Sequence, residues 1–594
     1  MAWATITKER WPGGVVPNVT DYEAARAGFS WADARAALDG LPGGRGLNIA
    51  HEAIDRHAAG ATAGKVAVRW LRRDGTVEDA TYAELAERTD RFASALGALG
   101  VRSGDAVFTL LGRVPELWVT ALGTLKATAV FAPLYAAYGP EPVRERLVRG
   151  EGRVLVTTPT LYRRRVEPIR DRLPALAHVL LVGPPDGEPP AGTRWFDEVV
   201  AAAPGGFEIP ATDPEAPAIV HFTSGTTGTP KGAVHVHEAV VAHHATGAIA
   251  LDLHPDDVFW CTADPGWVTG TSYGIVAPLT HGVTVVVDEG DFDADRWCRI
   301  LAEQRVTVWY TSPTALRMLR RAGPEAIGGH DLSALRLVAS VGEPLDPDLV
   351  AWGMEVLGHP VHDSWWQTET GGIMIANLAG CEIRPGSMGR PLPGIEVAVL
   401  ARGDDGRAAA AVDGSVQELG PDEAGELALR PGWPSMFRGY LHDDERYAAC
   451  FAGGWYLTGD VVRRDVEGWI WFVGRADDVI TSAGHLIGPV EVEQTLRQHP
   501  AVVDAGVVGV PDEVAGELVK AYVVVRPDLP VTEELVSDVL AFARRRLGPT
   551  VAPRSIEVVD DLPHTRSGKI VRRVLRARAR GLAEDDRSTP EAPL

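Results

Sequence analysis

The chain has 594 residues, with 58 lysines and arginines against 80 aspartates and glutamates, and a formal net charge of −22. This length exceeds what one hydrophobic core usually supports, so two or more domains are expected. The acidic excess argues against charge-driven binding to nucleic acid or to an anionic membrane.

The N-terminus has no apolar core of signal-peptide length, and no apolar run approaches the roughly 18 residues of a membrane span. The four cysteines show neither a C-x-x-C pair nor the density of a disulfide framework; they are Cys261, Cys298, Cys381 and Cys450. We therefore expect a soluble, cytoplasmic protein with free thiols.

From residue 47 to residue 287, helical patterns alternate with short apolar runs such as 107–111 and 283–287. The alternation continues through 306–310 and 335–339. It predicts an α/β fold in which helices flank mixed and parallel sheets.

Between 389 and 474, short strand-like runs with many Gly and Asp residues predict a small β-rich subdomain, with a surface loop or hairpin at 401–421. A separate α+β pattern begins after residue 478. Its expected elements are a helix at 490–498, strands at 502–510 and 521–525, and a helix at 532–547. The expected division is an N-terminal extension (1–45), a large domain (46–474), a hinge (475–478), a mobile C-terminal domain (479–582) and a disordered tail (583–594).

Residues 221–232, HFTSGTTGTPKG, follow an apolar run at 218–220. Glycines let backbone N–H groups turn toward one anion, hydroxyls add further donors, and Lys231 adds a positive charge. The stretch is not a Walker loop, because Pro230 precedes the lysine and Gly232 follows it. A polar connector is the plain alternative, but the position between a strand-like run and a helical pattern favours a phosphate-binding segment.

Four further blocks accompany this segment in chain order: DSWWQTETGG (363–372), WYLTGD (455–460), GRADD (474–478) and PHTRSGK (563–569). Together the five blocks resemble the signature motifs of the acyl-adenylate-forming superfamily of acyl-CoA synthetases, luciferases and adenylation domains. With ADPGWVTG (263–270) and SVGEP (340–344), the wording is most similar to the acetyl-CoA synthetase branch. The resemblance covers most of the chain.

The resemblance implies an active site for ATP. Lys569 matches the catalytic lysine that bridges the acid, the α-phosphate and ribose oxygens, and Glu369 matches the Mg²⁺ ligand. For Trp365, packing in the core is the favoured interpretation, although it is counted with the nucleotide residues. The residues implied to bind ATP or AMP are Thr223, Ser224, Gly225, Thr226, Thr227, Gly228, Lys231, Gly342, Glu343, Pro344, Asp363, Trp365, Gln367, Thr368, Asp460 and Arg475.

Other positions match the acyl pocket, the hinge and the CoA site. Trp366 resembles the tryptophan that closes the acyl pocket, with further walls at Trp267, Val268, Thr269 and Val341. Asp477 resembles the hinge residue about which the C-terminal domain swings. Gly484 and His485 match the segment that approaches CoA, although Leu486 stands where the family commonly has arginine. Arg163 and Arg164 are hypothesised to hold the CoA 3′-phosphate, but an arginine run is also typical of a solvated face.

The implied activity is that of an AMP-forming acid–thiol ligase, which takes acetate first and propionate second, with ATP, CoA and Mg²⁺. A medium-chain or aryl acyl-CoA ligase stays open, because 487–493 resembles that branch too. So does an adenylation module that loads a carrier protein, or a nucleotide-binding partner without turnover. A lysine acetyltransferase and a deacetylase acting on Lys569 are the hypothesised protein partners.

Overall fold

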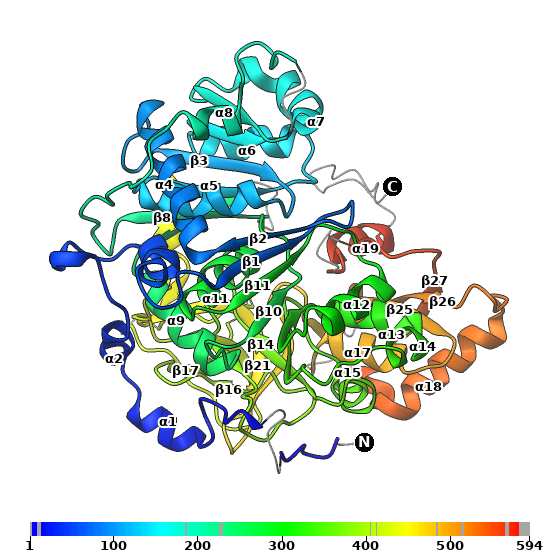
Figure 1. The fold of residues 1–594 in the computed structure, drawn as a ribbon. Coiled ribbons are helices and arrows are strands. Elements are labelled where there is room, and N and C mark those ends of the chain that lie inside the picture. The colour runs from blue at the N-terminus through cyan, green and yellow to red at the C-terminus, as the bar shows by residue number, and fades with distance from the viewer. Residues whose placement is uncertain are drawn as a thin grey trace.

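The computed structural model describes residues 3–8, 14–183, 187–224, 230–403, 406–411, 413–482, 485–512, 516–564 and 569–580. It has helix-flanked mixed sheets in the large N-terminal part and a smaller α+β part at the C-terminus (Figure 1). The predicted fold class is confirmed. The tail predicted at 583–594 lies outside the described residues.

The first large sheet has nine strands. Their spatial order is β16 (Arg390–Pro391), β15 (Ile375–Ala376), β14 (Val361–Trp365), β13 (Leu337–Val341), β12 (Val308–Thr311), β10 (Val258–Cys261), β11 (Thr284–Asp288), β1 (Val66–Leu71) and β2 (Val77–Thr81). All neighbours from β14 to β1 are parallel. Continuous apolar runs such as Val-Val-Val in β11 suit this position, because a parallel sheet is covered by helices on both faces.

The second large sheet has eight strands. Their order is β19 (Gly439–Tyr440), β9 (Pro230–Val236), β8 (Pro217–Ser224), β4 (Val130–Tyr135), β3 (Ala106–Leu111), β5 (Val154–Thr157), β6 (His178–Leu181) and β7 (Arg194–Trp195). The connection after the phosphate segment differs from the expectation. Lys231 is the second residue of β9, an antiparallel strand that pairs with β8, and helix α9 (Ala239–Ala250) begins only later. The run after Gly232 is Ala-Val-His-Val, whose β-branched residues favour a strand.

The predicted β-rich subdomain is a five-stranded antiparallel sheet. Its strands are β17 (Val397–Leu400), β18 (Ala424–Leu429), β21 (Trp455–Arg464), β20 (Phe451–Ala452) and β22 (Ile470–Arg475). Strands β21 and β22 form a hairpin in which Asp460 lies opposite Arg475. Asp460 and Arg475, which are 15 residues apart in the sequence and belong to two different blocks, are thereby brought side by side.

The C-terminal part also has five strands. They are β24 (His485–Ile487), β23 (Ile480–Ser482), β26 (Gly516–Val525), β25 (Val502–Asp512) and β27 (Ser555–Val558). Its helices are α17 (Pro489–Arg497), α18 (Glu533–Val551) and α19 (Arg572–Ala579). This part has apolar clusters of its own, built from residues after 479. The exact domain limits stay predictions.

The longer helices of the N-terminal part cover the two large sheets. They are α4 (Tyr82–Ala98), α5 (Pro115–Lys126), α6 (Pro140–Arg149), α9, α12 (Ala294–Glu303) and α13 (Pro313–Ala322). Helix α4 begins at a capping box in which Thr81 and Glu84 satisfy each other's backbone N–H groups. Within the described ranges, no helix is both long and apolar enough to cross a membrane.

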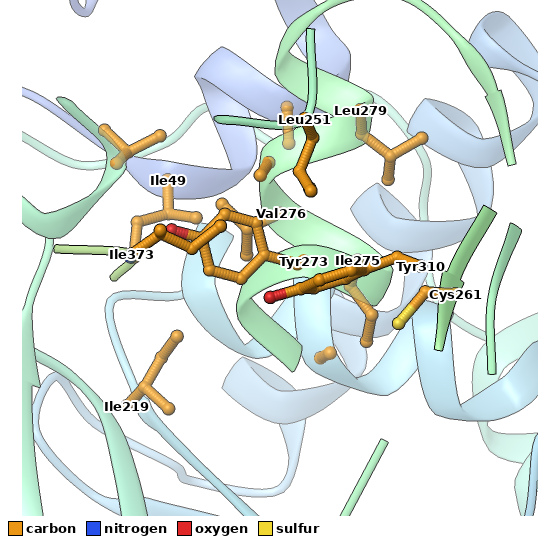
Figure 2. Packing of buried hydrophobic residues seen from close by; sticks show 14 of the residues in the cluster. Ile49, Ile219, Leu251, Cys261, Tyr273, Ile275, Val276, Leu279, Tyr310 and Ile373 are labelled. Atoms are coloured by element: carbon orange, nitrogen blue, oxygen red, sulfur yellow. The ribbon is translucent and has the colours of Figure 1, made fainter. Parts of the chain in front are cut away.

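The main core lies between the two large sheets, and Tyr273 and Tyr310 lie inside it (Figure 2). Their ring centroids are 5.9 Å apart, edge to face. Tyr310 lies near the end of β12, at the sheet edge that carries the candidate site. It therefore borders both the core and the site.

Candidate active site

The site lies at the carboxyl ends of four adjacent parallel strands. Strands β10, β12, β13 and β14 pair in that order. The blocks at 263–270, 340–344 and 363–372 each include or follow the end of one of them. Because parallel strands all end at the same edge of a sheet, residues far apart in the sequence meet there.

Asp460 is the centre of a hydrogen-bond cluster. Its buried carboxylate accepts bonds from Trp365 Nε1 (2.9 Å) and Gln367 Nε2 (3.0 Å) at Oδ2, and from Arg475 Nη1 (2.7 Å) at Oδ1. Gln367 is itself fixed, because Tyr456 donates to its Oε1 at 2.9 Å. The proximity of Asp460 raises the pKa of Arg475, which stays a cation. Trp365 is thus more than a packing residue.

Glu343 is held by helix α13. Thr314 Oγ1 donates to Glu343 Oε1 at 2.7 Å, and the Arg317 guanidinium pairs with Oε2. Gly342 has a φ of +95°, a backbone conformation that L-residues rarely adopt. A Cβ built there would lie 3.8 Å from the Trp267 ring. The chain therefore turns sharply beneath Trp267.

Glu369 and Lys231 meet at Tyr440. The Tyr440 hydroxyl donates to Glu369 Oε1 at 2.7 Å, and Lys231 Nζ lies 5.4 Å from the centroid of the Tyr440 ring. Burial raises the pKa of Tyr440, so its hydroxyl keeps the proton that it donates. Among the described residues there is no cluster of three or more His, Cys, Asp or Glu that would hold a metal ion by itself. A cation held by Glu369 would therefore need oxygens from a ligand.

Lys569 reaches this edge from the C-terminal part. Its Nζ lies 5.7 Å from the centroid of the Trp267 ring. The residue keeps an exposed surface, yet loss of hydration within the site lowers the pKa of its ammonium group, against the opposing effect of Glu343. Asp460 and Glu369 are also close enough to raise this pKa. The catalytic candidate and the nucleotide candidates thus share one site.

The acyl-pocket candidates lie behind this site. Trp366 follows β14, and its Nε1 donates to the Tyr310 hydroxyl at 3.2 Å, while its ring meets that of Tyr273 edge to face at 5.0 Å. Three further candidates are buried, namely Val268 and Thr269 in the short helix α10 (Val268–Thr271) and Val341 at the end of β13.

Several residues that contact the candidates were not predicted from the sequence, namely Tyr273, Tyr310, Thr314, Arg317, Tyr440 and Tyr456. The sequence signal that could have identified Tyr310 is its place at the end of the apolar run 306–310, a predicted strand that ends beside the site. Tyr456 lies inside the recognised block 455–460, where its role was not predicted. The other four fall in helices or a short strand outside the recognised blocks.

The remaining candidates are less well placed. Thr223 lies opposite Lys231 on the paired strands, and Pro344 follows Glu343. Thr368 accepts a bond from Gly371 N at 3.2 Å through its carbonyl. Asp363 is buried in β14, and burial raises its pKa to about 7. Asp477 Oδ1 lies 3.7 Å from Arg475 Nε, at the junction between the two parts.

For some candidate residues, the described part of the structure shows no contact with the site. Gly225, Thr226, Thr227, Gly228 and Gly484 lie outside the described residues, as do the side chains of Ser224 and His485. Arg163 and Arg164 are exposed on a single turn of π-helix (Tyr162–Val166). Among the described residues they make no hydrogen bond or ion pair with any site residue.

Comparison with known proteins gives the class of this chain. Residues 55–441 match the AMP-binding enzyme family, and residues 491–569 match the AMP-binding enzyme C-terminal domain. The chain belongs to the AMP-binding enzyme family.

Its relatives include acetyl-coenzyme A synthetases. The one from Bacillus subtilis is 43% identical over 580 residues, which cover 97% of this chain and 98% of that protein. The one from Streptomyces coelicolor is 36% identical, over 89% of this chain and 83% of that protein.

Two solved structures have a similar fold. The acyl-CoA synthetase of Brucella canis has a TM-score of 0.72 and 36% identity, covering 95% of this chain and 99% of that chain. The anthranilate CoA ligase AuaEII in complex with anthranoyl-AMP has a TM-score of 0.81 and 28% identity, covering 93% of this chain and 99% of that chain.

Proposed function

We propose that the protein is an AMP-forming acetyl-CoA synthetase. It joins acetate and ATP into acetyl-AMP with release of pyrophosphate, and then transfers the acetyl group to the CoA thiol with release of AMP. The convergence of Lys569, Glu343, Glu369 and Asp460 in one site carries this proposal. The relatives of known name, aligned over nearly the whole chain, supply the substrate class.

Adenylation brings two anions together, the acetate carboxylate and the α-phosphate. Lys569 supplies the cation that both require, and Lys231 supplies a second one on the phosphate side. Cations fixed in advance stabilise the charge that develops in the transition state without further reorganisation. The protein therefore contributes positioned charge and leaves the bond making to the substrates.

The nucleotide lies over the strand ends. Asp460 is an acceptor suited to the vicinal hydroxyls of ribose. Trp365, Gln367 and Arg475 hold its carboxylate in one orientation. Glycine at 342 lets the backbone of 342–344 pass close to the adenine, beneath Trp267. Thr368 and the 223–228 segment donate to the phosphates.

Glu369 would hold Mg²⁺. A carboxylate oxygen is the ligand type that this cation prefers, and phosphate oxygens and waters would supply its other ligands. When bound, the ion neutralises charge on the phosphates. Tyr440 orients the carboxylate by donating to Oε1, which fits a single protein ligand for the ion.

The acyl group of acetyl-AMP lies against Trp366, with Val268, Thr269 and Val341 as further walls. The indole occupies the space that a longer chain needs, so acetate is preferred over propionate and propionate over butyrate. After adenylation, the C-terminal part turns about Asp477 and brings Gly484 and His485 toward CoA. Arg163 and Arg164 then meet the 3′-phosphate.

A substrate panel tests the function. AMP release is measured with acetate, propionate, butyrate and benzoate, each with and without CoA. The proposal requires the highest kcat/KM for acetate and turnover with free CoA. Preference for butyrate or benzoate would identify a medium-chain or aryl ligase, which the similarity to the anthranilate ligase makes the second candidate. Turnover that needs a carrier protein would identify an adenylation module.

A further inference from the structure

The two parts of the chain meet through charges. Arg497, the last residue of α17, donates from Nη2 to Asp346 Oδ1 at 3.1 Å. Asp346 occupies the position just before helix α15 (Pro347–Trp352) of the N-terminal part. Figure 1 shows α17 beside α15. A second contact lies next to it, where Arg321 Nη2 donates to the carbonyl of Val503 at 2.8 Å.

This contact continues into the active site on one side. Asp346 Oδ2 also accepts from Arg317 Nη1 at 3.3 Å, and Arg317 holds Glu343 through its other nitrogen. Although burial opposes ionisation, Arg497 and Arg317 together hold the pKa of Asp346 below its ordinary value. Asp346 is therefore a carboxylate shared by one arginine from each part.

On the other side, the contact continues toward Lys569. Arg497 Nη1 lies 3.6 Å from Asp504 Oδ1, and Asp504 Oδ2 lies 3.2 Å from His564 Nε2. His564 is the second residue of the block 563–569, which ends at Lys569. An alternating row of charges thus runs from Glu343 through Arg317, Asp346, Arg497 and Asp504 to His564.

No buried apolar cluster spans the two parts within the described ranges. Among the described residues, each apolar cluster belongs wholly to residues before 474 or wholly to residues after 479. A cavity of about 290 Å³ lined by Arg317, Arg320, Arg321 and Arg497 remains beside the contact. A polar, incompletely packed interface is typical of parts that move relative to each other.

We propose that Asp346 and Arg497 form an interdomain latch that holds Lys569 at the nucleotide site. The latch serves adenylation and opens before the thioester is formed. Both are positioning residues, because each acts through Lys569 or Glu343 rather than on the reacting atoms. The proposal rests on the proposed function, since it assigns the latch to one half-reaction.

The test compares two half-reactions in purified full-length enzyme. Acetate-dependent exchange of pyrophosphate into ATP reports adenylation, and acetyl-CoA formation from supplied acetyl-AMP reports the second step. Arg497→Gln should lower exchange by roughly tenfold or more, as expected when a buried ion pair loses one partner. Thioester formation should stay within about twofold of the wild-type rate. Loss of a hydrogen bond that contributes to this step would lower the rate by more than that. Arg497→Lys, which keeps the charge, should restore part of the exchange.

Controls separate the latch from general damage. Arg526→Gln removes an exposed arginine whose partner is the nearby Asp528, and should change neither step. Asp346→Asn should lower exchange like Arg497→Gln, and the double variant should be no worse than the more affected single one, because both act through one contact. Thermal unfolding of each variant shows that it is folded.

Three results would overturn the latch while wild-type enzyme still exchanges pyrophosphate. They are unchanged exchange in Arg497→Gln, equal loss of both half-reactions, and losses that multiply in the double variant. Absence of exchange in the wild-type enzyme with acetate would instead overturn the proposed function.

Discussion

The indole nitrogen of Trp366 donates a hydrogen bond to the hydroxyl of Tyr310 across 3.2 Å. Tyr310 is completely buried, and its hydroxyl also lies 2.9 Å from Ser364 Oγ. The proposed wall of the acyl pocket, which follows β14, is thus fixed from the core side by a residue of β12, two strands away in the sheet.

Tyr310→Phe should loosen the choice of acid. Without the hydroxyl the indole of Trp366 loses its partner, and a lost hydrogen bond of this kind costs about 1 kcal/mol. The ratio of kcat/KM for acetate to that for butyrate should fall by roughly fivefold, which corresponds to that energy. Steady-state kinetics with the two acids measures the ratio.

Two further variants serve as comparisons for Tyr310→Phe, one with a larger expected effect and one as a control. Trp366→Gly removes the wall and should lower the ratio much more than Tyr310→Phe. Tyr82→Phe removes another buried hydroxyl, which donates to Val283 O at 2.8 Å away from the site, and should leave the ratio unchanged. An unaltered ratio in Tyr310→Phe would show that the indole needs no such support.

Lys569→Ala should separate the two half-reactions completely. The alanine variant lacks the cation that adenylation needs, so pyrophosphate exchange should fall by roughly a thousandfold, as for loss of a principal electrostatic group. Acetyl-CoA formation from supplied acetyl-AMP should stay near the wild-type rate. Lys520→Ala, whose lysine pairs with Glu557 in the same part of the chain, is the control. Equal loss of both steps would remove Lys569 from its role.

Adenylation should fail at alkaline pH earlier than an ordinary lysine would allow. Loss of hydration lowers the pKa of Lys569 below 10.5. Since the cation is the active form, kcat/KM for exchange should fall as the pH rises through this lowered pKa. Activity recovered on return to pH 8 excludes unfolding. A profile that stays level up to pH 10.5 would show that no such group controls the step.

Asp460→Asn should weaken ATP binding in particular. The change removes the negative charge that pairs with Arg475 and one acceptor that the ribose requires. The KM for ATP should rise by roughly tenfold, as expected for loss of a charged hydrogen bond, while the KM for acetate stays nearly constant. Glu418→Gln, which removes an exposed partner of Arg464, serves as the control. A parallel rise in both KM values would point to general distortion.

Acetylation of Lys569 should inactivate the enzyme reversibly. The acetyl group removes the positive charge and adds bulk beside Trp267. Protein acetylated at this position alone should lose exchange, and treatment with a lysine deacetylase should restore it, with mass spectrometry following the modification. Full exchange by the acetylated protein would contradict the need for a cation.

Much of the fold followed from local patterns. Apolar runs such as Val-Val-Val in β11 and the amphipathic α18 predicted their elements to within a few residues. The connection at Lys231 was expected to lead into a helix, and it instead pairs as a strand with β8. A short run of β-branched residues suits either role until a partner strand is present.

The sequence by itself determined the family, the fold class and the chemical types at the site, because those are encoded in contiguous blocks such as 363–372 and 563–569. Only the tertiary structure decided that Trp365 and Gln367 hold Asp460, that Tyr310 holds Trp366, and that Arg497 reaches Asp346. These contacts join residues 56 to 151 positions apart. They depend on the order of parallel strands and on how two separately packed parts meet, and neither is written in any short stretch of sequence.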